Sequence, residues 1–246
     1  MFIVPFCLFW YLLLKRFYDG IAAWMQSSEI LIFASNWFDL DLLTRLFIDH
    51  PPTLSTFLLI ALYTAPFFAA LAANDMYASD ISNGYFRFLI SRSRRIEIFL
   101  ARFLSTFLLT ALLLAIAGIA AMLISIYIEA APLGQALLYT IQIILVVILY
   151  STPYLACMAI VSTMAHSAIA ALLLGMVGYV AILVCIFIAN HTLTDTNLFA
   201  YLLPSGIRPD LVSNDPMARS MALASLPAYT FIFGFLAWAI FRKRNF

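Results

Sequence analysis

The chain has 246 residues, of which 65% are hydrophobic and 10% charged, and its mean hydropathy is +1.03. Soluble globular domains carry about 45–50% apolar and about 25% charged residues, so the composition excludes a soluble domain and indicates an integral membrane protein. The formal net charge of +1 gives no sign of a nucleic-acid partner, and we expect none. Cys7, Cys157 and Cys185 lie in apolar runs without metal-site spacing, and we expect them to be small core residues.

The first part of the chain contains two apolar segments. Residues 1–18 are apolar but short, and residues 53–73 form a second segment in which Pro66 is expected to cause a kink. A spanning helix needs about 20 apolar residues, so the first segment either spans or only half enters the membrane. The interval 19–52 mixes acidic residues with tryptophan and phenylalanine, which is typical of the headgroup zone. We expect an outer loop with one or two interfacial helices there.

Four further apolar segments follow, at 103–128, 136–164, 168–189 and 221–240. A tight outer turn at 129–135, a minimal inner turn at 165–167 and an outer segment at 190–220 separate them. The pattern predicts an all-α, polytopic membrane protein with six transmembrane helices in a single domain. Within the outer segment, Ala200 to Gly206 is largely apolar. We expect it to be helical and packed at the outer membrane boundary, because free backbone groups cannot face lipid.

The orientation follows from the polar loop at 75–102. This loop holds five of the thirteen Lys and Arg residues: Arg87, Arg92, Arg94, Arg95 and Arg102. Such a bias marks a cytoplasmic loop. With this loop inside, both termini are predicted to be cytoplasmic, and Lys15 and Arg16 are the main exceptions to the charge rule.

The same loop contains a candidate short helix over Ile81 to Ile90. Asp80 is expected to cap it, because a carboxylate accepts hydrogen bonds from the free N–H groups of a first turn. An aromatic surface is expected from three residues: Tyr85, Phe86 and Phe88. A helix of this kind either lies in the membrane interface or docks on a soluble partner.

The loop resembles the first cytoplasmic loop of ABC-2 type transporter permeases. The resemblance rests on Asp75, Asp80, Gly84, the run Ser91 to Arg95, and Arg102 at the start of the next span. The chain departs from the family's usual Glu, Pro and Lys, having here Ser82 or Asn83, Ser93 and Arg102. Because the apolar run begins at Met1, we expect no counterpart of the family's interfacial helix before the first span. The six spans, the short second inner loop and the large outer segment extend the resemblance over essentially the whole chain. In the family the outer segment partly re-enters the membrane, and Leu202 to Gly206 is the matching place.

The resemblance implies a transmembrane subunit of an ATP-driven exporter in the plasma (inner) membrane. Two such subunits would form the translocation pathway and pair with two separate ATPase subunits. The sequence has no GxxxxGK[ST] motif, so ATP and Mg would bind to the ATPase, and this chain would bind no cofactor and catalyse no bond chemistry. The residues that the resemblance places against the ATPase are Asp80, Gly84, Tyr85, Phe86, Phe88, Arg94 and Arg95. Gly84 would lie one turn into the helix, either facing the ATPase or as a simple weak point.

Apart from Lys15 and Arg16 near the end of the first segment, the polar residues inside the predicted spans are few and uncharged. Thr140, Gln142 and Ser151 either line a weakly polar pathway or form hydrogen bonds between helices, worth less than about 2 kcal/mol each. The lack of charged residues at the span centres argues against ion-coupled transport, and the three histidines lack HExxH spacing. Two other functions stay open: a non-transporting membrane anchor or assembly protein that uses the same loop, and an ion-independent channel or scramblase.

Overall fold

The computed structural model describes residues 2–18, 47, 50–90, 92–192, 201–213 and 215–244, and the regular elements in these residues are helices. The elements are α1 (Ile3–Tyr18), α5 (Pro52–Ala73), α6 (Ala78–Ser82), α7 (Tyr85–Ile90), α8 (Arg95–Ile128), α9 (Leu133–Met164), α10 (Ala168–Thr192), the 3-10 turn η2 (Pro204–Ile207), α11 (Arg208–Val212) and α12 (Pro216–Lys243). The interfacial helices expected at 19–52 fall almost wholly outside the described residues.

Five helices in this part of the chain are long and apolar enough to cross a membrane: α5, α8, α9, α10 and α12. The chain is therefore an all-α, multi-pass membrane protein. The sixth expected span, α1, has 16 residues and is about 24 Å long at 1.5 Å per residue, whereas the hydrocarbon core is about 30 Å thick. A count of six spans therefore stays a prediction.

The helices extend beyond the apolar segments that predicted them. α8 begins at Arg95, not near residue 103, and α12 runs from Pro216 to Lys243, past both ends of the predicted 221–240. The apolar run ends where the lipid would end, but the backbone ladder continues through charged residues, whose long side chains can reach the headgroups. As a result, Arg102 lies inside a helix, and the predicted loop at 75–102 is shorter than expected.

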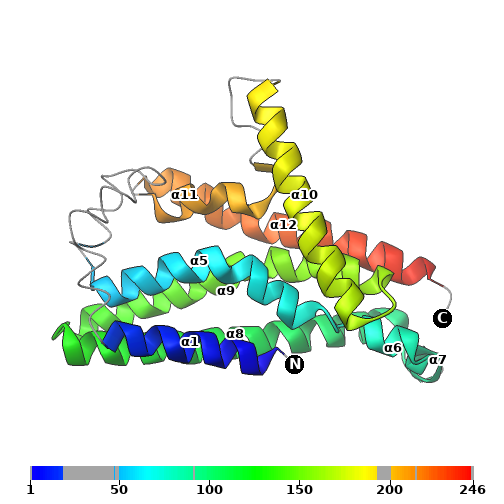
Figure 1. The fold of residues 1–246 in the computed structure, drawn as a ribbon, viewed down its shortest axis with the longest axis horizontal. Coiled ribbons are helices and arrows are strands. Elements are labelled where there is room, and N and C mark those ends of the chain that lie inside the picture. The colour runs from blue at the N-terminus through cyan, green and yellow to red at the C-terminus, as the bar shows by residue number, and fades with distance from the viewer. Residues whose placement is uncertain are drawn as a thin grey trace.

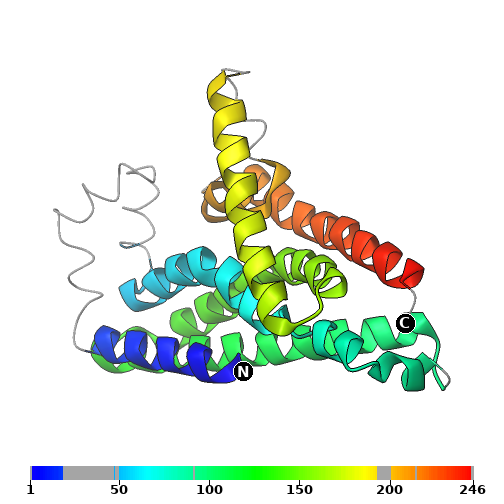
Figure 2. The same cartoon turned by 45° about the vertical axis from the view of Figure 1, so that its right-hand side comes forward.

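α9 is the central helix, in contact with α5, α8, α10 and α12. Its neighbours come close where they carry glycine. A Cβ at Gly118 of α8 would lie 2.7 Å from Ile144 Cγ1, and one at Gly175 of α10 would lie 2.5 Å from Met158 Sδ. Small residues allow such close helix packing in membranes. Figures 1 and 2 show α1, α5, α8 and α9 lying together, whereas α10 leaves the bundle steeply.

α1 packs antiparallel to α5 through aromatic rings. Near its start, Phe6 meets Phe68 with ring centroids 5.0 Å apart, and further along, Trp10 meets Phe57 at 4.7 Å. Because these contacts run in opposite directions along the two helices, the basic end of α1 at Lys15 and Arg16 lies near the start of α5.

The polar loops gather at the two ends of the bundle. At one end, Glu129 accepts hydrogen bonds from Thr53 N at 2.9 Å and from Ser125 Oγ at 2.9 Å. At the other end, Ser162 Oγ accepts from Tyr77 N at 3.0 Å and donates to Asn74 O at 3.2 Å. Successive loops along the chain therefore lie at alternate ends of the bundle, in the order that the sequence predicts. Which end faces the cytoplasm stays a prediction based on the basic residues.

Candidate functional site

The polar loop between α5 and α8 folds as two short helices, α6 and α7, joined at Asn83 and Gly84. The predicted single helix over Ile81 to Ile90 is therefore wrong. Gly84 has a φ of +68°, in the left-handed region that favours glycine, and its N–H donates to Ile81 O at 3.2 Å. Gly84 thus ends one helix and does not lie inside one. The Asn83–Gly84 pair could have indicated this helix end, because such pairs commonly follow the last turn of a helix.

Asp80 does not cap a helix. It lies in the first turn of α6, where its carboxylate pairs with the Arg102 guanidinium of α8. The acceptor at the start of α6 is instead Asp75 Oδ1, which bonds Ser79 N at 3.3 Å and the Ser79 hydroxyl. Asp75 can do this because it precedes the helix, where the unpaired N–H groups point. The half-exposed pair of Asp80 and Arg102 is worth at most about 1 kcal/mol, but it ties α6 to α8.

The aromatic residues of α7 point in opposite directions. Phe86 is fully buried, and its ring meets Phe241 of α12 edge to face with centroids 5.4 Å apart. Tyr85 and Phe88 are 49% and 73% exposed. Phe86, expected against a partner, therefore anchors α7 to the bundle. We call Tyr85 and Phe88 the outward aromatic face.

The two predicted arginines also have different surroundings. Arg94 is exposed at the start of α8, where its backbone N–H donates to Glu97 Oε2 at 3.1 Å. The Arg95 side chain donates from Nη1 to Arg242 O at 2.7 Å and to Arg244 O at 3.2 Å. These carbonyls lie at the C-terminal end of α12 and have no intrahelical donor. Arg95 thus fixes the end of α12, and Arg94 stays at the surface.

Thr140, Gln142 and Ser151 do not form one polar path. Thr140 Oγ1 donates to Ala136 O at 2.7 Å and Ser151 Oγ donates to Ile148 O at 2.8 Å, so both hydroxyls bond to α9 itself. Both residues are buried, whereas Gln142 is exposed on the opposite face of the helix. The expected pathway lining is therefore divided between two faces.

A partly buried arginine that the sequence did not single out lies in α11. Arg208 Nε donates to Tyr150 OH at 2.6 Å and Nη2 to Tyr179 OH at 3.5 Å, and Cζ lies 4.6 Å from the ring centroid of Tyr63. Tyr150 OH is 2.6 Å from Tyr154 OH. We call these five residues the arginine–tyrosine cluster.

The cluster lies deep among the spans. Tyr63, Tyr150 and Tyr179 are each near the middle of α5, α9 or α10. A charge at that depth is costly and is a functional-site hypothesis by default. Sequence reasoning missed Arg208 because it counted the residue in an outer loop. The available signal was the row of tyrosines in the spans, whose hydroxyl groups need partners when buried.

The segment that carries Arg208 packs onto the bundle. Leu203, Pro204, Ile207 and Leu211 are buried. The segment expected to be helical and packed at Ala200 to Gly206 thus packs on the bundle from Leu203 onward, in the 3-10 turn η2, and its position at the outer membrane boundary stays a prediction. At its exposed edge, Tyr201 OH donates to Asp210 Oδ2 at 3.2 Å. The Asp210 carboxylate raises the pKa of the Tyr201 phenol above its usual value, because it disfavours a second negative charge.

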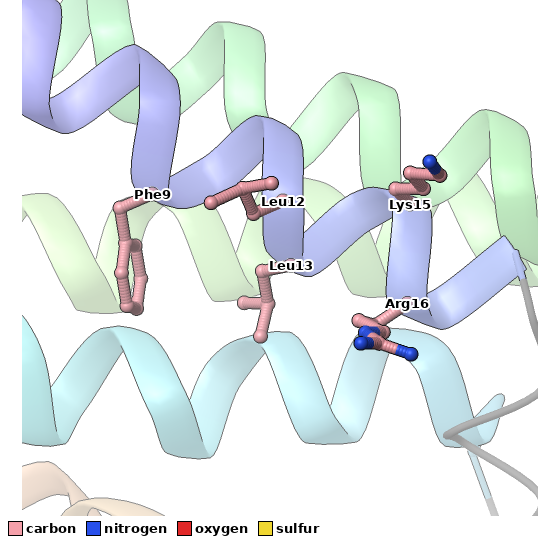
Figure 3. Close-up of a pocket in the computed structure, with 5 residues that line it drawn as sticks. All are labelled: Phe9, Leu12, Leu13, Lys15 and Arg16. Carbon is pink, nitrogen blue, oxygen red and sulfur yellow. The ribbon is translucent and has the colours of Figure 1, made fainter.

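A shallow cavity of about 460 Å³ lies along α1, lined by Phe9, Leu12, Leu13, Lys15 and Arg16. Figure 3 shows Phe9, Leu13 and Arg16 pointing toward α5, whereas Lys15 lies on another side of the helix. The described lining comes from one helix and holds no carboxylate, hydroxyl or thiol group. Within the described part of the chain, no group of three His, Cys, Asp or Glu side chains could hold a metal ion.

Comparison with known proteins gives one finding. The sequence model of a family described as "Protein of unknown function (DUF2705)" matches residues 21–246. No curated protein matches the chain. A functional proposal must therefore rest on the geometry of the loop between α5 and α8 and on the arginine–tyrosine cluster.

Proposed function

The chain belongs to the DUF2705 family, and we propose that it is the transmembrane subunit of an ATP-driven exporter of the ABC-2 type, whose ATPase is a separate polypeptide. The observation that carries the proposal is the outward aromatic face of α7, at the end of the bundle, next to the exposed Arg94. Large exposed aromatic side chains beside arginine are typical anchors for a protein partner.

The contacts of the loop would also transmit a movement of α6 and α7 to the ends of α8 and α12. Phe86 joins α7 to Phe241 of α12, Asp80 joins α6 to Arg102 of α8, and Tyr77 OH donates to Phe99 O at 2.9 Å. Figures 1 and 2 show α6 and α7 together at one end of the molecule. A partner that moves the outward aromatic face would therefore displace the ends of α8 and α12 as one body, which is the rigid-body input that transport needs.

The proposal includes a second permease subunit and the plasma (inner) membrane. α10 and α12 are largely exposed, with apolar side chains such as Val177, Phe187 and Phe231 on the surface. Lipid or a second subunit would cover these faces. The transported substrate would cross between the two subunits, and ATP with Mg would stay on the ATPase.

Co-purification tests the proposal. A tagged full-length chain is purified from membranes of cells that express it with its chromosomal neighbours, and nucleotide hydrolysis and bound proteins are measured. We expect an ATPase with a P-loop to copurify. Changing Tyr85 and Phe88 to Ala together should weaken its binding at least about thirtyfold, because losing even one interface anchor costs about 2 kcal/mol or more.

The matched control is Tyr127→Ala, which removes a similarly exposed aromatic side chain at the other end of α8. It should leave the ATPase bound. Recovery of a non-ATPase partner would favour the anchor function instead. Recovery of no partner, or an ATPase still bound to the Tyr85 and Phe88 double variant, would contradict the proposal.

A further inference from the structure

The guanidinium of Arg208 is held by phenols instead of an acid. Its hydrogen-bond acceptors are Tyr150 OH and Tyr179 OH, and the ring of Tyr63 lies against it. Across the described residues, Arg208 forms no ion pair. The nearest acid in sequence, Asp210, instead accepts from Tyr201. Phenols can solvate the cation but cannot neutralise it, so a positive charge remains among the spans.

Part of the guanidinium is left for another acceptor. An arginine carries five N–H donors in a planar fork. Nε–H is bonded to Tyr150 and one Nη2 hydrogen to Tyr179. The two Nη1 hydrogens and the second Nη2 hydrogen have no acceptor among the described residues. Nη1 and Nη2 together form the end of the fork, which matches two oxygens of a carboxylate or a phosphate.

The cluster reaches the surface of the spans. Tyr63 is 48% exposed, and Phe67, one turn further along α5, is similarly exposed. An anion that reaches Arg208 along this face would pass apolar side chains that favour an attached hydrocarbon chain. Tyr150 and Tyr154 close the inner side of the cluster, because both are almost fully buried.

We propose that the arginine–tyrosine cluster is a binding site for the oxyanion of an amphipathic molecule, a carboxylate or phosphate group that bears an apolar chain. The end of the Arg208 fork binds two oxygens, and the apolar chain lies along Tyr63 and Phe67. The site rests on this geometry alone and does not depend on coupling to an ATPase.

Binding to the full-length chain in dodecyl maltoside micelles, which carry no phosphate or carboxylate group, tests the site. The probe is dodecyl phosphate, with dodecanol as the uncharged analogue, and bound probe is measured by native mass spectrometry. We expect dodecyl phosphate, and not dodecanol, to bind the wild type. Arg208→Gln should weaken binding about tenfold or more, because it removes charge-assisted hydrogen bonds. Arg219→Gln, a change at an exposed arginine of α12, should leave binding unchanged.

Inorganic phosphate distinguishes the source of the anion. Binding of dodecyl phosphate without binding of inorganic phosphate, which we expect, supports a ligand from the membrane. If both dodecyl phosphate and inorganic phosphate bind the wild type and neither binds Arg208→Gln, the same site takes its anion from the aqueous phase. If Arg208→Gln does not fold, Arg208→Lys replaces it. This variant keeps the charge but lacks the fork, so it should bind several-fold more weakly.

Three results would overturn the site. The first is equal binding of dodecanol and dodecyl phosphate to the wild type. The second is unchanged affinity for dodecyl phosphate in a folded Arg208→Gln variant. The third is equal affinity of Arg208→Lys and the wild type for this probe.

Discussion

At the scale of single residues, the backbone conformation of Gly84 predicts a clear effect of substitution on the turn between α6 and α7. Its φ of +68° is strained for any residue with a Cβ, although a Cβ there would meet nothing within 4 Å. We expect Gly84→Ala to destabilise the turn between α6 and α7 by about 1–2 kcal/mol. Hydrogen exchange of residues 78–90 in the purified protein measures this change as faster exchange.

Gly178→Ala is the matched control for that change. Gly178 lies within α10 with ordinary helical backbone, and a Cβ there would also meet nothing within 4 Å. Alanine should therefore stabilise α10 by about 0.5–1 kcal/mol. If both substitutions slow exchange around them, Gly84 is an ordinary helix position and the turn is not held by its backbone conformation.

Single residues also show where sequence reasoning ends. Asp80, Arg102 and Gly84 could be identified as a pattern within one loop, since local spacing carries that information. Their roles could not, because whether Asp80 caps its own helix or pairs with Arg102 depends on how α6 packs on α8. Arg208 was missed for the same reason, since it meets tyrosines from three other helices.

At the scale of elements, α7 depends on α12. Phe86→Ala should lower the free energy that opens α7 from the bundle by about 3 kcal/mol, because a fully buried ring leaves a cavity. The backbone of residues 85–90 should then exchange about a hundredfold faster. Phe88→Ala, which removes an exposed ring of the same helix, should leave exchange unchanged. Equal rates for the two variants would contradict the division of α7 into an anchor and an outward aromatic face.

The elements themselves were largely predictable. The apolar segments at 53–73, 136–164 and 168–189 lie within α5, α9 and α10, because lipid demands long apolar helices. The ends of α8 and α12, in contrast, were not predictable from hydropathy, since both helices continue through charged residues. The break at Gly84 was missed because the residues on its two sides, from Ile81 to Ile90, were assigned to one helix.

At the scale of the whole molecule, topology can be decided by labelling. The three cysteines, two of them exposed, must first be replaced by Ala at positions 7, 157 and 185. Single cysteines at Ser93 and Ser213 should then label from opposite sides of the membrane, with Ser93 labelled from the cytoplasm. Three helices, α8, α9 and α10, lie between these two positions, so labelling of both from one side would mean that not all three cross the membrane.

A cysteine inserted directly after Met1 then decides between five and six spans. α1 is about 24 Å long, and Phe2 near its start packs against Phe68, which lies before the end of α5. A helix this short can still cross where the bilayer thins or where basic residues such as Lys15 and Arg16 reach the headgroups. We therefore expect the inserted cysteine to label from the same side as Ser93. Labelling from the side of Ser213 would mean that α1 does not cross, and it would contradict the antiparallel packing that places Phe2 beside Phe68 near the end of α5.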